Sequence, residues 1–152
     1  MSFGQMYWWR FSHMLSVLDQ AYIGVLASEE PDEELELDYY DLFLNSVLYV
    51  PTHKMNEEER ASVSEDDIAI VPVIVEDEGR QYIMLFDSKE RLKEWTDGEA
   101  FEAVEMRGCD AINIFGAENY HMMLNVMSEH QKEFSLEEIQ FLLSNIREEK
   151  KA

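Results

Sequence analysis

Four histidines and one cysteine are the side chains of this sequence best suited to nucleophilic, acid–base or metal chemistry. The histidines lie far apart in the chain, at His13, His53, His121 and His130. No two of them form the H-x-x-x-H pair that places two imidazoles on one helix face. His121 falls in a predicted strand, where we expect a half-buried, hydrogen-bonded side chain. Cys109 could begin a helix, where a thiolate is favoured, but the stronger expectation is a small buried core residue.

The carboxylates and glycines form no recognisable site. The acidic triplets at 65–67 and 76–78 could attract divalent cations, but neither has the alternating ligands and distal Glu of an EF-hand. With 33 Asp and Glu residues, chance acidic pairs are certain, so no general acid–base pair can be assigned. The six glycines form neither GxGxxG nor a phosphate-binding loop. The sequence therefore predicts no catalytic residue, no metal, no cofactor and no enzymatic activity.

The charge balance restricts the partners. The formal net charge is −21 over 152 residues, so nucleic-acid backbones and anionic membrane surfaces would repel the chain. We expect no nucleic-acid partner and no membrane partner. A basic protein partner remains open, and so does the simpler interpretation that the charge keeps an aromatic-rich and Met-rich domain soluble.

The single cysteine and the N-terminus indicate a cytoplasmic protein. One cysteine cannot form an intramolecular disulfide, which fits a reducing compartment. The N-terminal residues lack the basic segment, apolar run and cleavage site of a secretory signal. No apolar run approaches the roughly 20 residues that span a bilayer.

The N-terminal segment has the spacing of an amphipathic helix. Its apolar residues alternate gaps of three and four along one face: Trp8, Phe11, Leu15, Leu18, Tyr22 and Val25. Ser2 and Gln5 stand in capping-box positions ahead of this stripe, while Trp9 and Met14 widen the apolar arc. Part of so wide an arc should be buried by a second copy or by a partner, and a homodimer through this helix is the simpler of the two. The candidate interaction surface consists of Tyr7, Trp8, Trp9, Phe11 and Met14.

The rest of the first half predicts a helix followed by strands. Asp32 is the expected N-cap of a helix whose apolar face comprises Leu35, Tyr39, Leu42 and Phe43. A β-rich run at 47–50 is ended by Pro51, and a polar loop is expected at 52–67. An apolar strand follows at 68–75, with Pro72 at an edge, a bulge or the strand start.

The second half begins with a hairpin. A turn at 76–79 leads to a returning strand at 81–86. Ser88 should then cap a short helix that turns Leu92 and Trp95 inward and ends at residues 97–98.

Two strands and two helices are predicted beyond this point. A strand is expected at 103–106, a helix (with a strand as the alternative) at 109–115, and a strand at 121–127. Ser135 and Glu138 form a capping box for the last helix, with Phe134 and Ile139 as its hydrophobic staple. Together the elements predict one α+β domain over residues 1–152. It has a small, mainly antiparallel or mixed sheet covered by helices and an extra N-terminal amphipathic helix.

Four segments resemble, in order and spacing, the N-terminal domain of the SseB (enhanced serine sensitivity) protein family. They are a helix-to-strand entry at 40–51, a strand and capped helix at 86–95, a late strand at 124–128 and a closing helix at 136–139. The resemblance covers about residues 32–146 and leaves 1–31 as an N-terminal helical extension. It implies an α/β domain of a bacterial cytoplasmic protein, without catalytic residues to carry over.

Three functions fit these observations. The first is a non-enzymatic interaction or regulatory domain, indicated by the lack of a site constellation and by the aromatic helix. The second is an acidic immunity or inhibitor protein that neutralises a basic toxin or nuclease by charge complementarity. The third is a small-molecule sensor or an enzyme with a pocket that residue spacing does not reveal.

Overall fold

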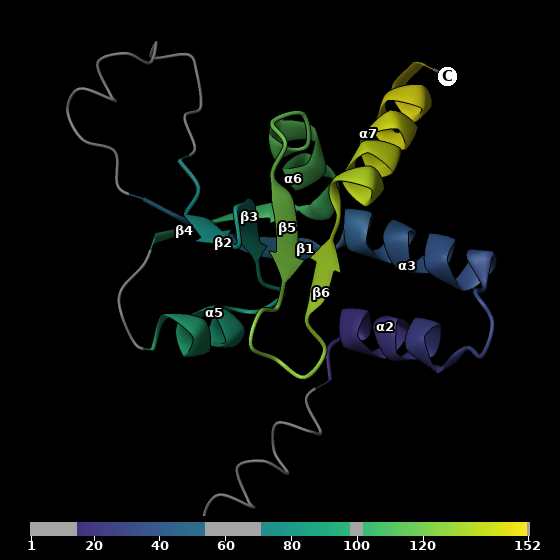
Figure 1. The fold of residues 1–152 in the computed structure, drawn as a ribbon, viewed down its shortest axis with the longest axis horizontal. Coiled ribbons are helices and arrows are strands. Elements are labelled where there is room, and N and C mark those ends of the chain that lie inside the picture. Colours follow the sequence, from purple (N-terminus) through teal and green to yellow (C-terminus); the bar gives the residue numbers. More distant parts are fainter. Residues whose placement is uncertain (1–14, 54–70, 98–101, 152) are drawn as a thin grey trace, which may run out of the picture. The chain divides into compact units, whose positions relative to one another are not determined.

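The computed structural model of the protein describes residues 15–53, 71–97 and 102–151. The chain divides into two compact units, Met1–Phe43 and Leu44–Ala152. The first unit holds α2 (Val17–Ala27) and most of α3 (Glu33–Asn45), and the second holds the strands and the later helices (Figure 1). The single-domain organisation therefore stays a prediction.

Helix α2 begins later than the N-terminal apolar stripe predicts. Ser16 Oγ accepts the Asp19 N–H at 3.0 Å, and Asp19 Oδ2 accepts the Ser16 N–H at 3.1 Å. This capping box leaves Ser16 extended, so Leu15 lies before the helix and is not part of its face. The three later residues of the stripe, Leu18, Tyr22 and Val25, are buried or half-buried, and Trp8 and Phe11 lie outside the described residues. The predicted capping box at Ser2 and Gln5 lies outside the described residues.

The cap of α3 is confirmed. Asp32 Oδ1 accepts the Leu35 N–H at 3.2 Å. Tyr39 and Phe43 are buried, as predicted. Leu35 was predicted to lie on the same buried face but is exposed. Within this unit the ring centroids of Tyr22 and Tyr39 are 5.6 Å apart, so the two helices share an aromatic contact.

The second unit contains a two-stranded and a four-stranded sheet, which confirms the α+β class. Strand β1 (Val47–Thr52) pairs antiparallel with β4 (Glu102–Arg107). The larger sheet has the order β2-β3-β5-β6, and only its central pair, β3–β5, is parallel. Its strands are β2 (Ile74–Asp77), β3 (Arg80–Leu85), β5 (His121–Leu124) and β6 (Lys132–Phe134). A bridge between Tyr49 and Phe86 connects the two sheets.

Two strand boundaries near prolines differ from the prediction. Pro51 does not end β1, because its carbonyl still accepts the Val73 N–H at 2.9 Å and the strand continues to Thr52. In the described part of the predicted strand at 68–75, which is residues 71–75, the regular strand begins at Ile74. Residues 71–73 pair with the end of β1 instead, and Pro72 forms an isolated bridge with Thr52 ahead of β2, where its missing N–H breaks no regular ladder. Residues 54–70, which contain most of the predicted polar loop, lie outside the described residues.

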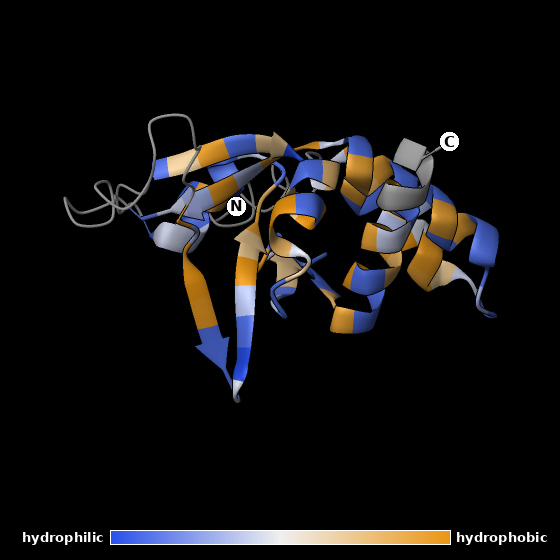
Figure 2. Cartoon of the chain, turned by 90° about the horizontal axis from the view of Figure 1, so that it is seen from above, coloured by the Kyte–Doolittle hydropathy of each residue, from blue (hydrophilic) through white to orange (hydrophobic). Residues whose placement is uncertain are grey.

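The β2–β3 hairpin is confirmed and closes through two residues. Glu78 and Gly79 have φ values of 51° and 81°, as in the type I′ turn that matches the twist of paired strands. Asp77 is the register partner of Arg80 on either side of this turn. Figure 2 shows the hairpin with a hydrophilic turn end and a hydrophobic base, so its base joins the core.

The two capped helices of this unit are confirmed. Ser88 Oγ accepts the Arg91 N–H at 3.2 Å at the start of α5 (Lys89–Thr96). At the start of α7 (Leu136–Lys151), Ser135 Oγ accepts the Glu138 N–H and Glu138 Oε1 accepts the Ser135 N–H, both at 3.2 Å. The staple residues Phe134 and Ile139 are fully buried.

Between α5 and α7, the structure decides between a helix and a strand at residues 109–115, and it differs from the sequence prediction at three places. Residues 109–115 belong to a helix, α6 (Gly108–Phe115). Cys109 is half-exposed rather than buried, because it lies beside the buried stripe of α6, which consists of Gly108, Ala111, Ile112 and Phe115. The predicted strand at 121–127 ends at Leu124, where the backbone turns to positive φ. Strand β6, with only three residues, was not predicted.

Within the described ranges, no helix combines the length and apolar character needed to cross a membrane.

We predict that Ser135→Ala lowers the free energy of unfolding by about 1 kcal/mol, because one N–H of the first turn of α7 loses its acceptor. The matched control is Ser144→Ala, the same change at an exposed position inside α7. Alanine is the better helix former, so the control should raise stability by a few tenths of a kcal/mol. Urea denaturation measures both variants, and equal midpoints for them would contradict the prediction.

Candidate functional site

One face of the four-stranded sheet carries an apolar cluster. Because side chains alternate along a strand, Tyr82, Met84 and Phe86 project to the same face. Leu92 from α5 completes this buried group, which we call the front cluster (Tyr82, Met84, Phe86 and Leu92). Four partly buried residues pack against it: Val75, Trp95, Met123 and Val126. Helix α5 therefore packs against this face with Leu92 and Trp95, as its spacing predicts.

The Tyr82 end of the front cluster is polar. The Tyr82 hydroxyl donates to Glu133 Oε1 at 2.5 Å, and Arg80 Nη1 lies 3.9 Å from the same oxygen. The hydrogen bond to this carboxylate, followed by burial, raises the pKa of Tyr82, so the phenol stays neutral at physiological pH. His121 stacks at 5.4 Å between ring centroids, and its Nδ1 is buried without a partner in the described part of the chain. These side chains come from three strands, β3, β5 and β6, and so form a contact across the sheet.

The other end of the front cluster is anchored by Asn125. This residue is 1% exposed and has φ 56°. Its N–H donates to the Leu85 carbonyl at 2.8 Å, and its Oδ1 accepts the Asp87 N–H at 3.0 Å. Asp87 also forms a largely buried ion pair with Arg91, with 3.2 Å between Nη1 and Oδ1. Asn125 thus fixes the start of α5 against the end of β5, where the parallel strands β3 and β5 both terminate.

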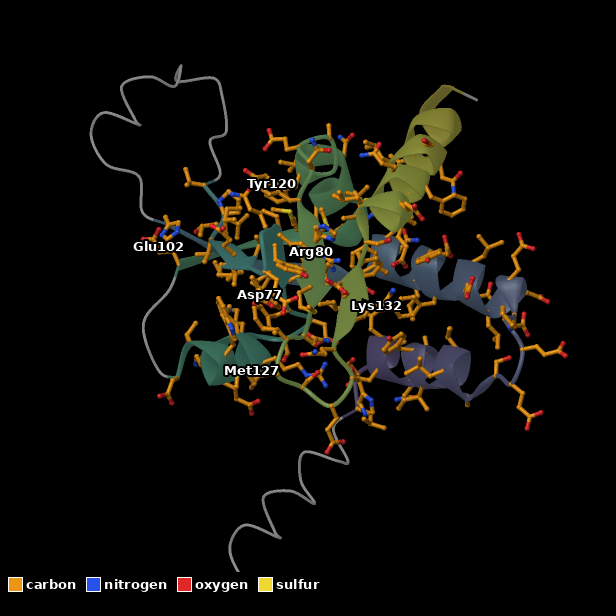
Figure 3. The ribbon with its side chains drawn as sticks, in the orientation of Figure 1. Asp77, Arg80, Glu102, Tyr120, Met127 and Lys132 are labelled. Carbon is orange, nitrogen blue, oxygen red and sulfur yellow. The ribbon has the colours of Figure 1, made fainter. Side chains whose placement is uncertain are left out.

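The loop that follows β5 presents Met127 to solvent. We call residues 125–131 the β5–β6 loop. The Met127 N–H donates to Gln131 Oε1 at 3.0 Å, and the Ser128 N–H donates to the Asn125 carbonyl at 3.1 Å. Met127 has φ 68°, and its residue surface is 79% exposed. Figure 3 shows it in this loop, below β5 and on the same side of the view as α5. A non-glycine residue in the left-handed region costs about 1 kcal/mol. Met127 therefore combines a strained backbone with an exposed apolar side chain.

The sequence-predicted surface cannot be compared with this site. Tyr7, Trp8, Trp9, Phe11 and Met14 lie outside the described residues, so they remain a prediction. Among the residues that the structure describes, no group of three or more His, Cys, Asp or Glu side chains could hold a metal ion. The expectations of no metal and no cofactor likewise stay predictions.

Sequence reasoning missed Asn125 and Met127 because it placed both in a strand. The alternating apolar pattern continues past Leu124, which favours a longer strand. A weaker signal was present, since Asn followed three residues later by Ser is typical of a turn.

Comparison with known proteins identifies the family. The family described as SseB protein N-terminal domain matches residues 20–140. The chain belongs to the SseB family. The resemblance predicted over residues 32–146 is therefore confirmed for the matched residues. Comparison with curated proteins and with solved structures gives no significant match. The SseB match includes the front cluster, Asn125 and the β5–β6 loop, so this site lies in the part of the chain that defines the family.

We predict that Asn125→Ala lowers the free energy of unfolding by about 2–3 kcal/mol. The Asp87 N–H loses its acceptor, and alanine is strained at positive φ. Asn125→Gly is the matched control, because glycine relieves the strain but also lacks the acceptor, and it should cost about 1–2 kcal/mol. Chemical denaturation gives both values. If both variants were as stable as the wild type, Asn125 would not anchor α5.

Proposed function

We propose that this SseB-family protein is a non-enzymatic protein-interaction domain and that Met127 is a contact residue. Met127 is unfavourable in two ways, since its left-handed φ is strained and its apolar side chain is solvated. Glycine would remove the strain, and a polar residue would remove the exposed apolar surface. Folding and solubility do not favour methionine at this position, whereas a partner that buries the side chain would.

The loop around Met127 supports the same conclusion. Its backbone is held by hydrogen bonds from Met127 to Gln131 and from Ser128 to Asn125. Little conformational entropy is therefore left to lose on binding, which favours affinity. Methionine is unbranched and polarisable, so it adapts well to an apolar pocket. Trp95 and Val126, both half-buried on the front cluster, supply apolar surface in the same region.

The chemistry of the partner follows from these features. It should offer an apolar pocket for Met127, and the net charge of −21 favours a basic rim around that pocket. A cytoplasmic protein partner meets these requirements without a cofactor or a catalytic step. The N-terminal residues 7–14 remain a second proposed surface, with self-association through them as its simplest use.

An acidic inhibitor of a basic toxin or nuclease is the second candidate, favoured by the same net charge. The two differ in their response to salt. Binding that depends mainly on burial of Met127 should lose only the contribution of the basic rim as salt rises, whereas binding that depends on charge throughout should weaken steeply.

We predict that Met127→Gly keeps or raises the free energy of unfolding, by up to about 1 kcal/mol, because the left-handed strain is relieved. The same change should weaken partner capture by about ten-fold, as expected for a buried anchor residue. Capture from the source-cell lysate, quantified at low and high salt, measures this loss, and thermal unfolding shows that the variant is folded.

The matched control is Ile114→Ser, which removes an apolar side chain that is 45% exposed on α6. It should leave capture unchanged. A photo-crosslinking residue at position 127 should label the captured protein, and the same residue at Glu129, two positions along the loop, should label it less. If Met127→Gly captured the same proteins as the wild type, Met127 would not be a contact residue.

A further inference from the structure

Strand β4 is the longest strand edge that lacks a partner in the described part of the chain. It pairs along one side with β1 over six residues, and no described strand lies on its other side. The two edge strands of the larger sheet, β2 and β6, have only four and three residues. Short edges are one way in which proteins avoid unwanted strand pairing, and β4 does not use it.

The register shows which backbone groups of β4 face outward. The Gly108 N–H donates to the Ser46 carbonyl at 3.0 Å, which continues the β1–β4 ladder by one pair. Hydrogen-bonded pairs alternate along an antiparallel ladder, so the even-numbered residues of β4 point toward β1. The odd-numbered residues Ala103 and Glu105 therefore point their N–H and C=O groups away from it. Arg107 points outward too, but its N–H is taken by Asp110 Oδ2 at 3.3 Å.

The side chains along this edge are exposed and mostly acidic. Glu102, Ala103 and Glu105 are all exposed, and Glu102 lies at the periphery of the side chains drawn in Figure 3. The pairing with β1 is regular at every position, so no bulge twists the edge away, and β4 contains no proline. The Glu105 carboxylate accepts only a long hydrogen bond, 3.4 Å from the Tyr49 hydroxyl. An incoming strand would meet open main-chain groups flanked by two carboxylates.

The charge decides which strand fits. A second copy would place glutamates on both sides of the pairing and would join two chains of net charge −21, so self-pairing is disfavoured. A strand with Lys or Arg opposite Glu105 gains an attractive cross-strand pair instead.

We propose that β4 binds, by strand addition, an extended basic segment of another protein with Lys or Arg at alternate positions. Ala103 and Glu105 would supply the main-chain hydrogen bonds, and Glu105 would select the positive charge. The inference rests on the proposed interaction function but assigns it a second surface that does not include Met127.

The probe is a synthetic decapeptide of five valine–lysine repeats. In an extended strand the N–H groups of the lysines point to one edge and those of the valines to the other. Two further peptides carry N-methyl groups on all lysines or on all valines, which blocks one edge while the charge stays constant. Titration calorimetry on the full chain should show binding of the parent peptide and of one methylated form. The form that binds should be the one methylated on valine. The form methylated on lysine should bind at least about ten-fold more weakly, because a lysine opposite Glu105 points its N–H toward the edge of β4.

Variants of β4 test the same contact from the other side. Ala103→Pro removes an outward N–H but leaves the bonds to β1 in place, and it should weaken peptide binding about ten-fold. Ala103→Ser is the matched control and should bind like the wild type. Glu105→Gln should weaken binding less, and its remaining affinity should depend less on salt. Since the methylated peptides are tested on unchanged protein, a folding defect in Ala103→Pro would not remove the test.

Three outcomes would overturn the inference. They are no binding of the parent peptide, equal binding of the two methylated peptides, and a proline variant that is folded yet binds normally. Equal binding of the methylated forms would mean that charge alone attracts the peptide. Met127→Gly should bind the parent peptide like the wild type, so failure at β4 and failure of the proposed function at Met127 are separate results.

Discussion

The second unit depends on β3 being buried on both faces. Every residue from Tyr82 to Leu85 is buried, and so is Phe86, which follows the strand. The strand pairs with β2 and β5, and Phe86 exchanges backbone hydrogen bonds of 2.7 and 3.0 Å with Tyr49 of β1. An apolar strand at this position joins the two sheets and gives α5 a surface to cover. Because neither face of β3 can carry unpaired polar groups, polar chemistry is confined to its ends.

Those ends explain where the unusual backbone lies. Parallel strands end at the same edge of a sheet, so the residues after β3 and β5 come together there. Asp87 and Asn125 meet at this edge, although 38 positions separate them in the sequence. Asn125 tolerates the left-handed region, which turns the chain immediately after β5. The position of Met127 follows from this turn, so its exposure is a consequence of how α5 is anchored.

The acidic charge and the short strand edges both oppose pairing of the chain with its own copies. A chain with many exposed carboxylates resists pairing with its own copies, because like charges meet at every symmetric contact. The edges of the four-stranded sheet are also short. Strand β4 is longer, and along its edge Glu102 and Glu105 add local repulsion to that of the net charge. One face of the four-stranded sheet is covered by α5 through Leu92 and Trp95, so the two surfaces that we propose for partners are a loop and a strand edge.

The sequence alone determined the features that depend on neighbouring residues. The caps at Asp32, Ser88 and Ser135 and the turn at Glu78–Gly79 need contacts within three or four positions, so residue types and spacing predict them. The cap at Ser16 is equally local, but the continuous apolar stripe predicted a helix through this position and no helix start. Only the tertiary structure decided where β5 ends, that three residues form β6, and that Cys109 stays half-exposed. The end of β5 and the pairing of β6 depend on partners distant in the chain, such as Leu85 for Asn125, and periodicity carries no information about such partners.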